Sequence, residues 1–397
     1  MSAVRRRRQT VSIAREPAPD LRVSRTSAPT PLKIALVAPP FYAVPPAGYG
    51  GIEAVVAQLA DGLVRRGHQV TLLAAAGSQT EARLLTTFDE PQWPQLGRPE
   101  PELLHAARVA EHIAELQPDL VHDHSAVGPA FARDRSVPTV VTSHGPATGA
   151  WGEYLEAAGD SMHLVAISQS QVDLTPELPW RAVVHNSLDA ADVPWRREKE
   201  DFVVWLGRFS PDKAAHLAID VARQAGRRIV LVGKCSEPDE QDYFDSEVQP
   251  RLGDRAEYLG EMDAAEKYDL MGRAAALVFP LQWEEPFGMV LLEAMACGTP
   301  VLSLARGAVP EVVVDGVTGF VRDDPEELVE CLGELDQIDP QACRRHVEQT
   351  FSPGAMVSGY EQVYADCLGA AAAPVVDEVV LPDLASGGSV PRQQAHH

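Results

Sequence analysis

Short apolar strands that alternate with helical segments constrain the fold of this chain more than any other feature. Residues 33–38 (KIALVA) form a continuous apolar run, which is typical of a parallel strand buried on both faces. A glycine-rich loop follows, then residues 52–66 with apolar side chains at helical spacing, then a second strand at 68–75. This alternation predicts a doubly wound α/β sheet. Its further elements are predicted as strands at 120–122, 139–142, 163–167 and 181–184 and as helices at 102–116 and 168–174.

The alternation restarts after residues 189–201, a polar segment with Pro194 and mixed charges that we interpret as a linker. A chain of 397 residues is long enough for two domains, and we expect them at 32–188 and 202–351. A last helix within 352–369 has apolar faces, and we expect it to pack back on the first domain. Ligands bind at the carboxyl ends of the strands in such sheets, so a ligand site is expected in the cleft between the domains. The second domain is predicted to have strands at 202–206, 228–232, 256–259, 275–280 and 300–304 and helices at 214–224, 264–272 and 288–296.

The two ends of the chain differ from this pattern. Residues 1–31 carry a basic run at 5–8, but no apolar segment follows it as in an export signal, and the remainder is rich in Ser, Thr, Pro and Arg. We expect a disordered extension there; a basic arm that contacts anionic lipid or RNA is the alternative. Residues 370–397 contain Ser-Gly-Gly and Gln-Gln and are also predicted to be disordered.

Charge and cysteine content argue against several classes of protein. A formal net charge of -23 disfavours nucleic acid as a partner, because phosphate backbones are bound by clustered Lys and Arg. No run approaches the ~18 apolar residues of a transmembrane segment. The five cysteines are widely spaced and form no C-x-x-C pair, which favours a reducing cytoplasm over a disulfide framework or a metal site. A cytoplasmic protein without a bound metal is therefore expected.

Two glutamates mark residues 283–319 as a candidate ligand site. Glu285 precedes Pro286 and Gly288, residue types that fit a loop at the start of a helix, and Glu293 lies eight positions beyond it, within that helix. If the intervening residues were all helical, the two carboxylates would be separated by roughly 12 Å along the axis. That separation suits the two ends of one extended ligand, and it is too wide for a carboxylate pair that flanks one hydrolysed bond.

Glycines follow the first predicted strand. Gly48, Gly50 and Gly51 lie where backbone N–H groups at a helix N-terminus can face a phosphate. A dinucleotide site would need G-x-G-x-x-G and an acidic residue after the second strand. Here the loop reads GYGGIE, with Glu53 in place of the third glycine, and the second strand ends in alanines. NAD is therefore not expected; a loop that needs glycine only for its turn is the alternative.

Two cations occupy the equivalent loop of the second domain, which reads GRFSPDK. Arg208 follows a strand and Lys213 begins the next helix, so both side chains can converge on a diphosphate, the guanidinium through paired hydrogen bonds and the ammonium as a point charge. Solvated surface cations are the alternative. The presence of Glu285 and Glu293 in the same domain favours the functional interpretation.

Histidines follow two predicted strands of the first domain. His144, in VVTSHG, lies where a doubly wound sheet presents ligand groups, and a hydrogen-bonded interior histidine is the alternative. His122 and His124 alternate around Asp123, so their rings share a face. Metal binding would need a third ligand that the spacing does not supply. Hydrogen bonding to substrate or to the backbone of the cleft is favoured for these two rings.

Together these motifs resemble the retaining nucleotide-sugar glycosyltransferases of family 4, the glycosyl transferases group 1. That family has the GT-B fold, in which two Rossmann-like domains face each other across a cleft. The resemblance covers most of residues 33–368. It is carried by GYGGIE, VHDH, VTSHG, VAISQS, VHNSLD and GRFSPDK, and with the highest specificity by EPFGMVLLEAMACGTPV followed by GAVPEVVVDGVTGFV.

The resemblance implies a role for each residue of the donor site. Arg208 and Lys213 would hold the donor diphosphate, and Glu293 would bind the ribose hydroxyls of the nucleotide. Glu285 would bind hydroxyls of the transferred sugar, together with three backbone N–H groups. These N–H groups belong to Phe287, Gly288 and Met289.

Residues of the first domain would complete that site. Gly50 and Gly51 would approach the phosphates, and His144 would contact the sugar near the reacting carbon. Glu311 is a weaker candidate. The sequence departs from the family pattern at Ala214, where a glycine commonly follows the lysine.

The implied reaction is the transfer, with retention, of a hexosyl group from a nucleoside-diphosphate sugar to an acceptor hydroxyl. The nucleotide sugar is a co-substrate, a UDP-sugar being favoured over a GDP-sugar, and neither a cofactor nor a metal ion is needed because the protein supplies the cations. A sugar, a glycan or a small metabolite is favoured as acceptor over a lipid, since helix 102–116 has Arg108 as its only fixed cation. Peripheral membrane contact is therefore not favoured. A catalytically silent nucleotide-sugar or glycan-binding protein, a nucleotide-sugar epimerase and a glycan phosphorylase are the alternatives.

Overall fold

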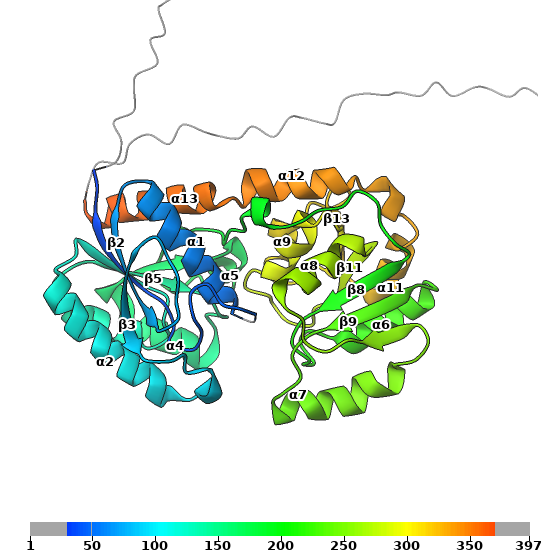
Figure 1. Ribbon diagram of the computed structural model, residues 1–397, viewed down its shortest axis with the longest axis horizontal. Coiled ribbons are helices and arrows are strands. Elements are labelled where there is room, and N and C mark those ends of the chain that lie inside the picture. Colours follow the sequence, from blue (N-terminus) through cyan, green and yellow to red (C-terminus); the bar gives the residue numbers. More distant parts are fainter. Residues whose placement is uncertain (1–29, 49, 370–397) are drawn as a thin grey trace, which may run out of the picture. The chain divides into compact units, whose positions relative to one another are not determined.

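Two parallel β-sheets organise the protein. The computed structural model describes residues 30–48 and 50–369. The first sheet has seven strands in the order β3-β2-β1-β4-β5-β6-β7, and the second has six in the order β10-β9-β8-β11-β12-β13. The two sheets are formed by consecutive parts of the chain, as the colours in Figure 1 show. Both orders reverse direction beside the first strand of their sheet, as in a doubly wound fold. The predicted α/β class with two Rossmann-like sheets is confirmed; the disorder predicted for 1–29 and 370–397 lies outside the described residues.

The first sheet and its helices follow the predicted alternation. Three elements were not predicted, namely β3, α3 and α4. Helix α3 has only four residues, too few to show a helical apolar pattern. β3 is an edge strand with only one buried side chain, and α4 buries only Leu155, so neither has a continuous apolar run or a clear apolar stripe. The elements are β1 (Lys33–Val37), α1 (Gly51–Arg65), β2 (Gln69–Ala75), β3 (Arg83–Phe88), α2 (Pro99–Leu116), β4 (Leu120–Asp123), α3 (Gly128–Phe131), β5 (Thr139–Ser143), α4 (Gly149–Ala158), β6 (His163–Ala166), α5 (Gln169–Leu174) and β7 (Trp180–Val183).

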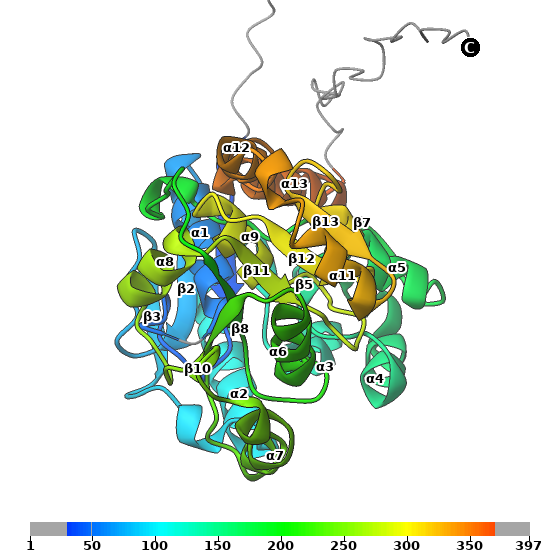
Figure 2. The same ribbon diagram turned by 90° about the vertical axis from the view of Figure 1, so that its right-hand side faces the viewer.

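The second sheet is the more completely buried of the two. Strand β8 (FVVWL) is buried at every position and includes Trp205, one of the largest fully buried side chains. Helices α6 and α11 pack against each other, as Figure 2 shows. The elements are β8 (Phe202–Leu206), α6 (Ala215–Gln224), β9 (Arg228–Val232), α7 (Pro238–Tyr243), β10 (Ala256–Tyr258), α8 (Ala264–Arg273), β11 (Ala276–Phe279), α9 (Met289–Ala296), β12 (Val301–Leu304), α10 (Val309–Val312), β13 (Gly319–Arg322), α11 (Pro325–Cys331) and α12 (Pro340–Thr350).

The last helix, α13 (Pro353–Cys367), returns to the first sheet and packs against α1. Val357, Tyr360 and Tyr364 of α13 are buried in the same apolar core as β1 and α1. Gly62 of α1 permits this close packing, because a Cβ there would lie 2.6 Å from Cγ2 of Val357. Within residues 30–48 and 50–369, no helix combines the length and the apolar character needed to cross a membrane.

Candidate functional site

A cavity of about 750 Å³, called here the large cavity, lies at the carboxyl ends of strands from both sheets. Its walls come from the loops after β1, β4 and β5 in the first sheet and after β8 and β11 in the second. This is the edge at which doubly wound sheets bind ligands. The residues predicted from the sequence that line it are Gly50, Gly51, His144, Arg208, Lys213, Glu285, Phe287, Gly288 and Met289.

A smaller cavity of about 370 Å³ adjoins the large one and is lined by Glu293. Arg208 and Met289 line both cavities, so the two spaces share a wall. The structure therefore places the two predicted glutamates in different compartments, Glu285 in the large cavity and Glu293 in the small one, with Arg208 at their junction. This arrangement fits one extended ligand that occupies both.

An ion pair fixes Glu285 at the wall of the large cavity. Lys213 Nζ donates to Glu285 Oε2, and Trp283 Nε1 donates to the same oxygen at 3.1 Å. The side chains of Lys213 and Glu285 are only 15% and 10% exposed, so the pair is largely desolvated. The Lys213 ammonium also lies 4.6 Å from the centroid of the Trp283 ring. Sequence reasoning identified both charges but not their pairing or the part of Trp283.

The backbone around Glu285 is held by Gly307, the first residue of the motif GAVPEVVVDGVTGFV, to which the sequence assigned no role. Ala308 N donates to Glu285 O at 2.8 Å, and Gly307 N donates to Glu284 Oε2 at 2.5 Å. A Cβ at Gly307 would lie 2.2 Å from Glu285 O and 2.3 Å from Glu285 N. Only glycine permits this approach. The motif marks Gly307, but its contact with Glu285 could not be predicted, because the two residues are distant in sequence.

Arg208 is less constrained than Lys213. Its guanidinium lies 3.8 Å from Asp212 and 4.0 Å from Glu240, and its side chain is 45% exposed. Arg208 therefore keeps donors available for an anionic ligand.

The residue after Lys213 has an unusual backbone: Ala214 has φ 51° and is fully buried. Glycine would adopt this conformation without the penalty of a side chain.

Lys267 is the partner of Glu293 in the small cavity. Its ammonium donates to Glu293 Oε1 at 2.6 Å, and both side chains are largely buried. Tyr268 lines the same cavity, and burial, assisted by the charge of Glu293, raises the pKa of its hydroxyl. Lys267 lies on α8 and has no motif around it, so the sequence analysis did not find it.

Three histidine rings, those of His122, His124 and His144, pack together at the wall of the large cavity. His124 Nδ1 and His144 Nε2 share a hydrogen bond of 2.8 Å, and both residues line the cavity. His122 lies behind them and bonds Tyr364 Oη at 2.7 Å and Thr142 Oγ1 at 2.8 Å. The prediction that His122 bonds substrate or cleft backbone is therefore wrong, because side chains of the core use both of its ring nitrogens. Burial lowers the pKa of His144 to about 4, so its imidazole is neutral at pH 7.

Acidification is expected to destabilise the protein through four buried imidazoles. Burial lowers their pKa below the ordinary value of 6.5, so between pH 6.5 and about 4 the unfolded chain binds protons that the folded chain excludes, and stability falls as the pH falls. Two buried carboxyls oppose this, since burial raises the pKa of Glu53 and Glu102 to about 7. The four imidazoles are those of His105, His122, His124 and His144.

The imidazoles outnumber the carboxyls, so we expect the melting temperature to be lower at pH 5 than at pH 7.5. Proton NMR should also show four histidine C2–H signals that do not titrate between these values. A higher melting temperature at pH 5, or twelve titrating histidines, would contradict the assignment.

Glu311 lies outside both cavities. It accepts hydrogen bonds from the backbone N–H groups of Gln169 at 2.8 Å and Ser170 at 2.6 Å, at the start of α5, and His185 Nε2 lies 3.2 Å away. Its carboxylate thus connects α10 to the first turn of α5. This position does not agree with the predicted role of Glu311 in the ligand site.

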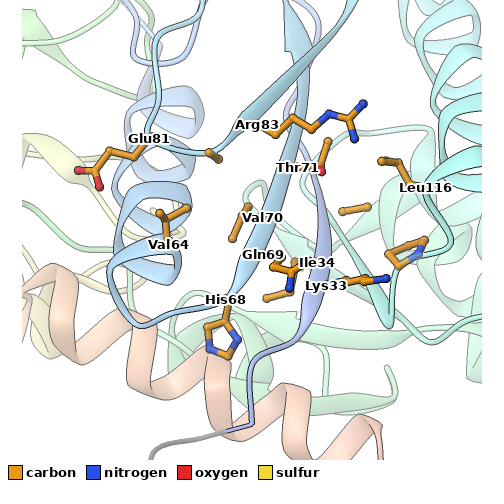
Figure 3. A pocket seen from close by; sticks show the side chains of 13 residues that line it. Lys33, Ile34, Val64, His68, Gln69, Val70, Thr71, Glu81, Arg83 and Leu116 are labelled. Carbon is orange, nitrogen blue, oxygen red and sulfur yellow. The ribbon is translucent and has the colours of Figure 1, made fainter.

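A third cavity, of about 510 Å³, lies at the opposite edge of the first sheet (Figure 3). Lys33, Gln69 and Arg83, at the amino ends of β1, β2 and β3, line it, and none of the predicted site residues does. In the part of the chain that the structure describes, no group of three or more His, Cys, Asp or Glu side chains is placed to hold a metal ion.

Two family models match consecutive parts of the chain. The model of Glycosyltransferase Family 4 matches residues 49–192, and that of Glycosyl transferases group 1 matches residues 190–345. The chain is also 27% identical over 362 residues to the glycogen synthase of Mycobacterium tuberculosis, a match that covers 76% of this chain and 86% of the relative. Together the two family models match residues 49–345, which include strands of both sheets.

Solved structures agree with this assignment. AviGT4, a glycosyltransferase involved in avilamycin A biosynthesis, is 30% identical with a TM-score of 0.66, and the match covers 86% of this chain and 99% of AviGT4. Anabaena HepE, solved in complex with UDP-glucose, is 20% identical with a TM-score of 0.64, and the match covers 85% of this chain and 99% of HepE. At this identity the likeness supports the fold alone. The chain therefore belongs to the family 4, group 1 glycosyltransferases and is a glycosyltransferase with the GT-B fold.

Proposed function

We propose that the protein is a retaining glycosyltransferase that moves a hexosyl group from a nucleoside-diphosphate sugar to a hydroxyl of a sugar, glycan or small metabolite. One observation carries the proposal. Glu285 and Glu293 lie in separate, adjoining cavities, and Arg208 lines both. An elongated donor with an anionic centre and a polyhydroxyl group at each end matches this order of side chains.

The donor is assigned along the two cavities from one end to the other. The ribose hydroxyls bind Glu293 in the small cavity, where Lys267 keeps the carboxylate in place at 2.6 Å. The diphosphate lies beside Arg208 and Lys213, with Gly50 and Gly51 on its other side. The hexosyl group lies in the large cavity against Glu285, near the backbone N–H groups at the start of α9, Phe287, Gly288 and Met289.

The same side chains account for the chemistry. When the bond between the sugar and the diphosphate breaks, negative charge develops on the departing oxygen, and Arg208, Lys213 and the N-terminus of α9 stabilise that charge. Because these groups belong to the protein, we propose that the reaction needs no divalent metal. We propose a uridine donor ahead of a guanosine donor; HepE, which shares the fold, was solved in complex with UDP-glucose.

The acceptor proton needs a destination. His144 is a weak base at pH 7 because burial lowers its pKa to about 4. We therefore propose a front-face reaction: the acceptor oxygen bonds the anomeric carbon, the bond from that carbon to the diphosphate oxygen breaks, and the acceptor proton moves to a phosphate oxygen. His144 binds the sugar as a neutral ring.

All five cysteines are free thiols, which supports a cytoplasmic location.

Nucleotide sugars test the proposal directly. We expect UDP-glucose to raise the melting temperature more than GDP-mannose, because a ligand that binds the folded state stabilises it by mass action, by about 2.7 kcal/mol at a hundredfold excess over its Kd. Transfer should persist in EDTA, and NMR of the product should show the anomeric configuration of the donor.

Three other outcomes would contradict the proposal. A product of inverted configuration would exclude the front-face reaction. Donor binding without donor hydrolysis or transfer, across a broad set of acceptors, would indicate a silent binding protein. A sugar product formed without any acceptor, or one that depends on free phosphate, would indicate an epimerase or a phosphorylase.

A further inference from the structure

Two buried carboxyls on the first-sheet side of the large cavity have no role in the donor assignment. Glu53, in the first turn of α1, is 4% exposed, and Glu102, in α2, is 6% exposed, and both line the cavity. Glu53 Oε2 lies close to the glycine loop, 3.2 Å from the position of a Cβ on Gly50. Among the described residues, no lysine or arginine forms an ion pair with either carboxyl. Buried acidic groups without a counter-ion are rare in proteins.

The first sheet places no cation on this wall. Of the described residues that line the large cavity, the lysine and arginine side chains are Lys213 and Arg208, and both follow strand β8 of the second sheet. Lys213 is already paired with Glu285. The imidazoles of His124 and His144 are neutral because burial lowers their pKa. A ligand on this wall therefore meets acidic and neutral groups.

Buried polar atoms without a hydrogen-bond partner gather at the same cavity. Of seven such side-chain atoms in the described part of the chain, four belong to residues that line this cavity, and the other three belong to His105, Arg135 and Glu240. A buried polar atom left unpaired costs about 1–3 kcal/mol, so a side-chain rotation that turns the four atoms toward the cavity and pairs them with hydroxyls of a ligand would be favourable. The four atoms are Glu102 Oε2, His124 Nε2, Ser143 Oγ and Asn186 Oδ1.

We propose that this wall, formed by Glu53, Glu102 and His124, is the acceptor subsite, and that it takes a polyhydroxyl acceptor without negative charge. The proposal rests on the function proposed above. Hydroxyl or ammonium groups of the acceptor donate to the two carboxyls, and Trp151 of α4, which lines the same cavity, covers an apolar face of the ring. An acceptor with a phosphate or carboxylate would bring a further negative charge to a wall on which the described residues place no cation.

The ionisation of the pair is consistent with this selectivity. Burial raises the pKa of both Glu53 and Glu102 to about 7, and repulsion from an acidic neighbour adds to each rise, from Glu102 on Glu53 and from Asp123 on Glu102. Near pH 7 the pair therefore holds about one proton. The protonated carboxyl hydrogen-bonds hydroxyls as donor and acceptor, and the ionised one accepts from hydroxyls or from an ammonium.

A matched set of four sugars tests the acceptor class on the full-length protein. Glucose, glucosamine, glucose 6-phosphate and glucuronic acid share one ring and differ in charge. With UDP-glucose as donor, we expect kcat/KM for glucose or glucosamine to exceed that for both anionic sugars by about tenfold or more. The comparison of glucose with glucosamine then tells whether hydroxyl or ammonium donors dominate. Preference for an anionic sugar, or no transfer to any of the four while the donor is hydrolysed, would overturn the proposal.

Variants separate this subsite from the donor site. Glu102→Gln keeps the shape of the side chain and is expected to raise the KM for the neutral acceptor about tenfold, with the thermal shift caused by UDP equal to that of the wild type. Glu53→Gln is the second test, in case Glu102→Gln does not fold. Glu111→Gln, exposed on the same helix, is the control and should leave the acceptor KM unchanged.

The two proposals fail in different ways. If the wild type neither binds UDP nor hydrolyses UDP-glucose, the proposed donor is wrong. If the donor is turned over but Glu102→Gln and Glu53→Gln retain the wild-type acceptor KM, the donor assignment stands and the acceptor subsite is wrong.

Discussion

Replacing Lys213 with methionine is expected to lower kcat/KM for sugar transfer by about 10²–10³-fold, the range found when one donor to a developing negative charge is removed. Lys213 lines the large cavity, and its ammonium is the partner of Glu285. Methionine retains the apolar stem that packs near Trp283, so the change removes mainly the charge. The measurement is initial-rate kinetics with UDP-glucose, and a Lys213→Met protein with wild-type rates would contradict the role.

The ion pair between Lys213 and Glu285 also predicts how the two substitutions should combine in their effect on the free energy of unfolding. Lys213→Met leaves Glu285 buried without its counter-ion, and breaking one partner of a buried pair destabilises by about 3–5 kcal/mol. Adding Glu285→Gln should recover much of this loss in urea denaturation without restoring transfer. Lys33→Ala is the control, because Lys33 is an exposed lysine at the opposite edge of the first sheet. Equal stability of single and double variants would argue against an energetic coupling.

Replacing Gly307 with alanine is expected to reduce both stability and activity. A Cβ there would lie 2.2 Å from the carbonyl oxygen and 2.3 Å from the nitrogen of Glu285, so the backbone that carries this glutamate must move. Gly307 also has φ 56°, a conformation that an L-residue adopts at a cost of about 1–2 kcal/mol. Together with the overpacking, the expected loss is about 2–5 kcal/mol, measured by urea denaturation.

Gly316 provides the matched control. It has a similar φ of 71°, but a Cβ there would meet nothing within 4 Å. Gly316→Ala should therefore show only the conformational part of the loss, about 1–2 kcal/mol, with normal transfer. The difference between the two variants reports the displacement of the Glu285 loop. If both variants lose the same stability and neither loses activity, the close contact at Gly307 has no bearing on the site.

Fully buried elements were the most predictable from the sequence. Strands β1 and β8 are continuous apolar runs because both faces are covered by helices, and their predicted bounds agree with the structure within one residue. Two of the four edge strands, β3 and β13, were not recognised. β3 is largely accessible, and β13 has only four residues, two of them buried, so neither carries the apolar signal on which such predictions depend. Short helices such as α10 and α11 were missed for the same reason.

The candidate site shows the same division. Residues within motifs, such as Glu285 and Arg208, could be proposed from the sequence, and the structure brings them to one cavity. Their contacts could not, because they depend on three-dimensional structure: Glu293 pairs with Lys267 from another helix, and the backbone of Glu285 packs against Gly307 of a separate motif. Glu311 was predicted near the ligand and instead connects to α5.

The sequence by itself determined the doubly wound class, the two tandem alternations and the charged residues of the candidate site. These properties depend on local periodicity and on residue type at strand ends, which a linear chain records directly. The tertiary structure alone decided that Glu285 and Glu293 face separate cavities and that Glu53 and Glu102 form one acidic wall. Burial and ion pairing are properties of contacts between distant segments, so only the folded chain sets which charges are neutralised and which are left for a ligand.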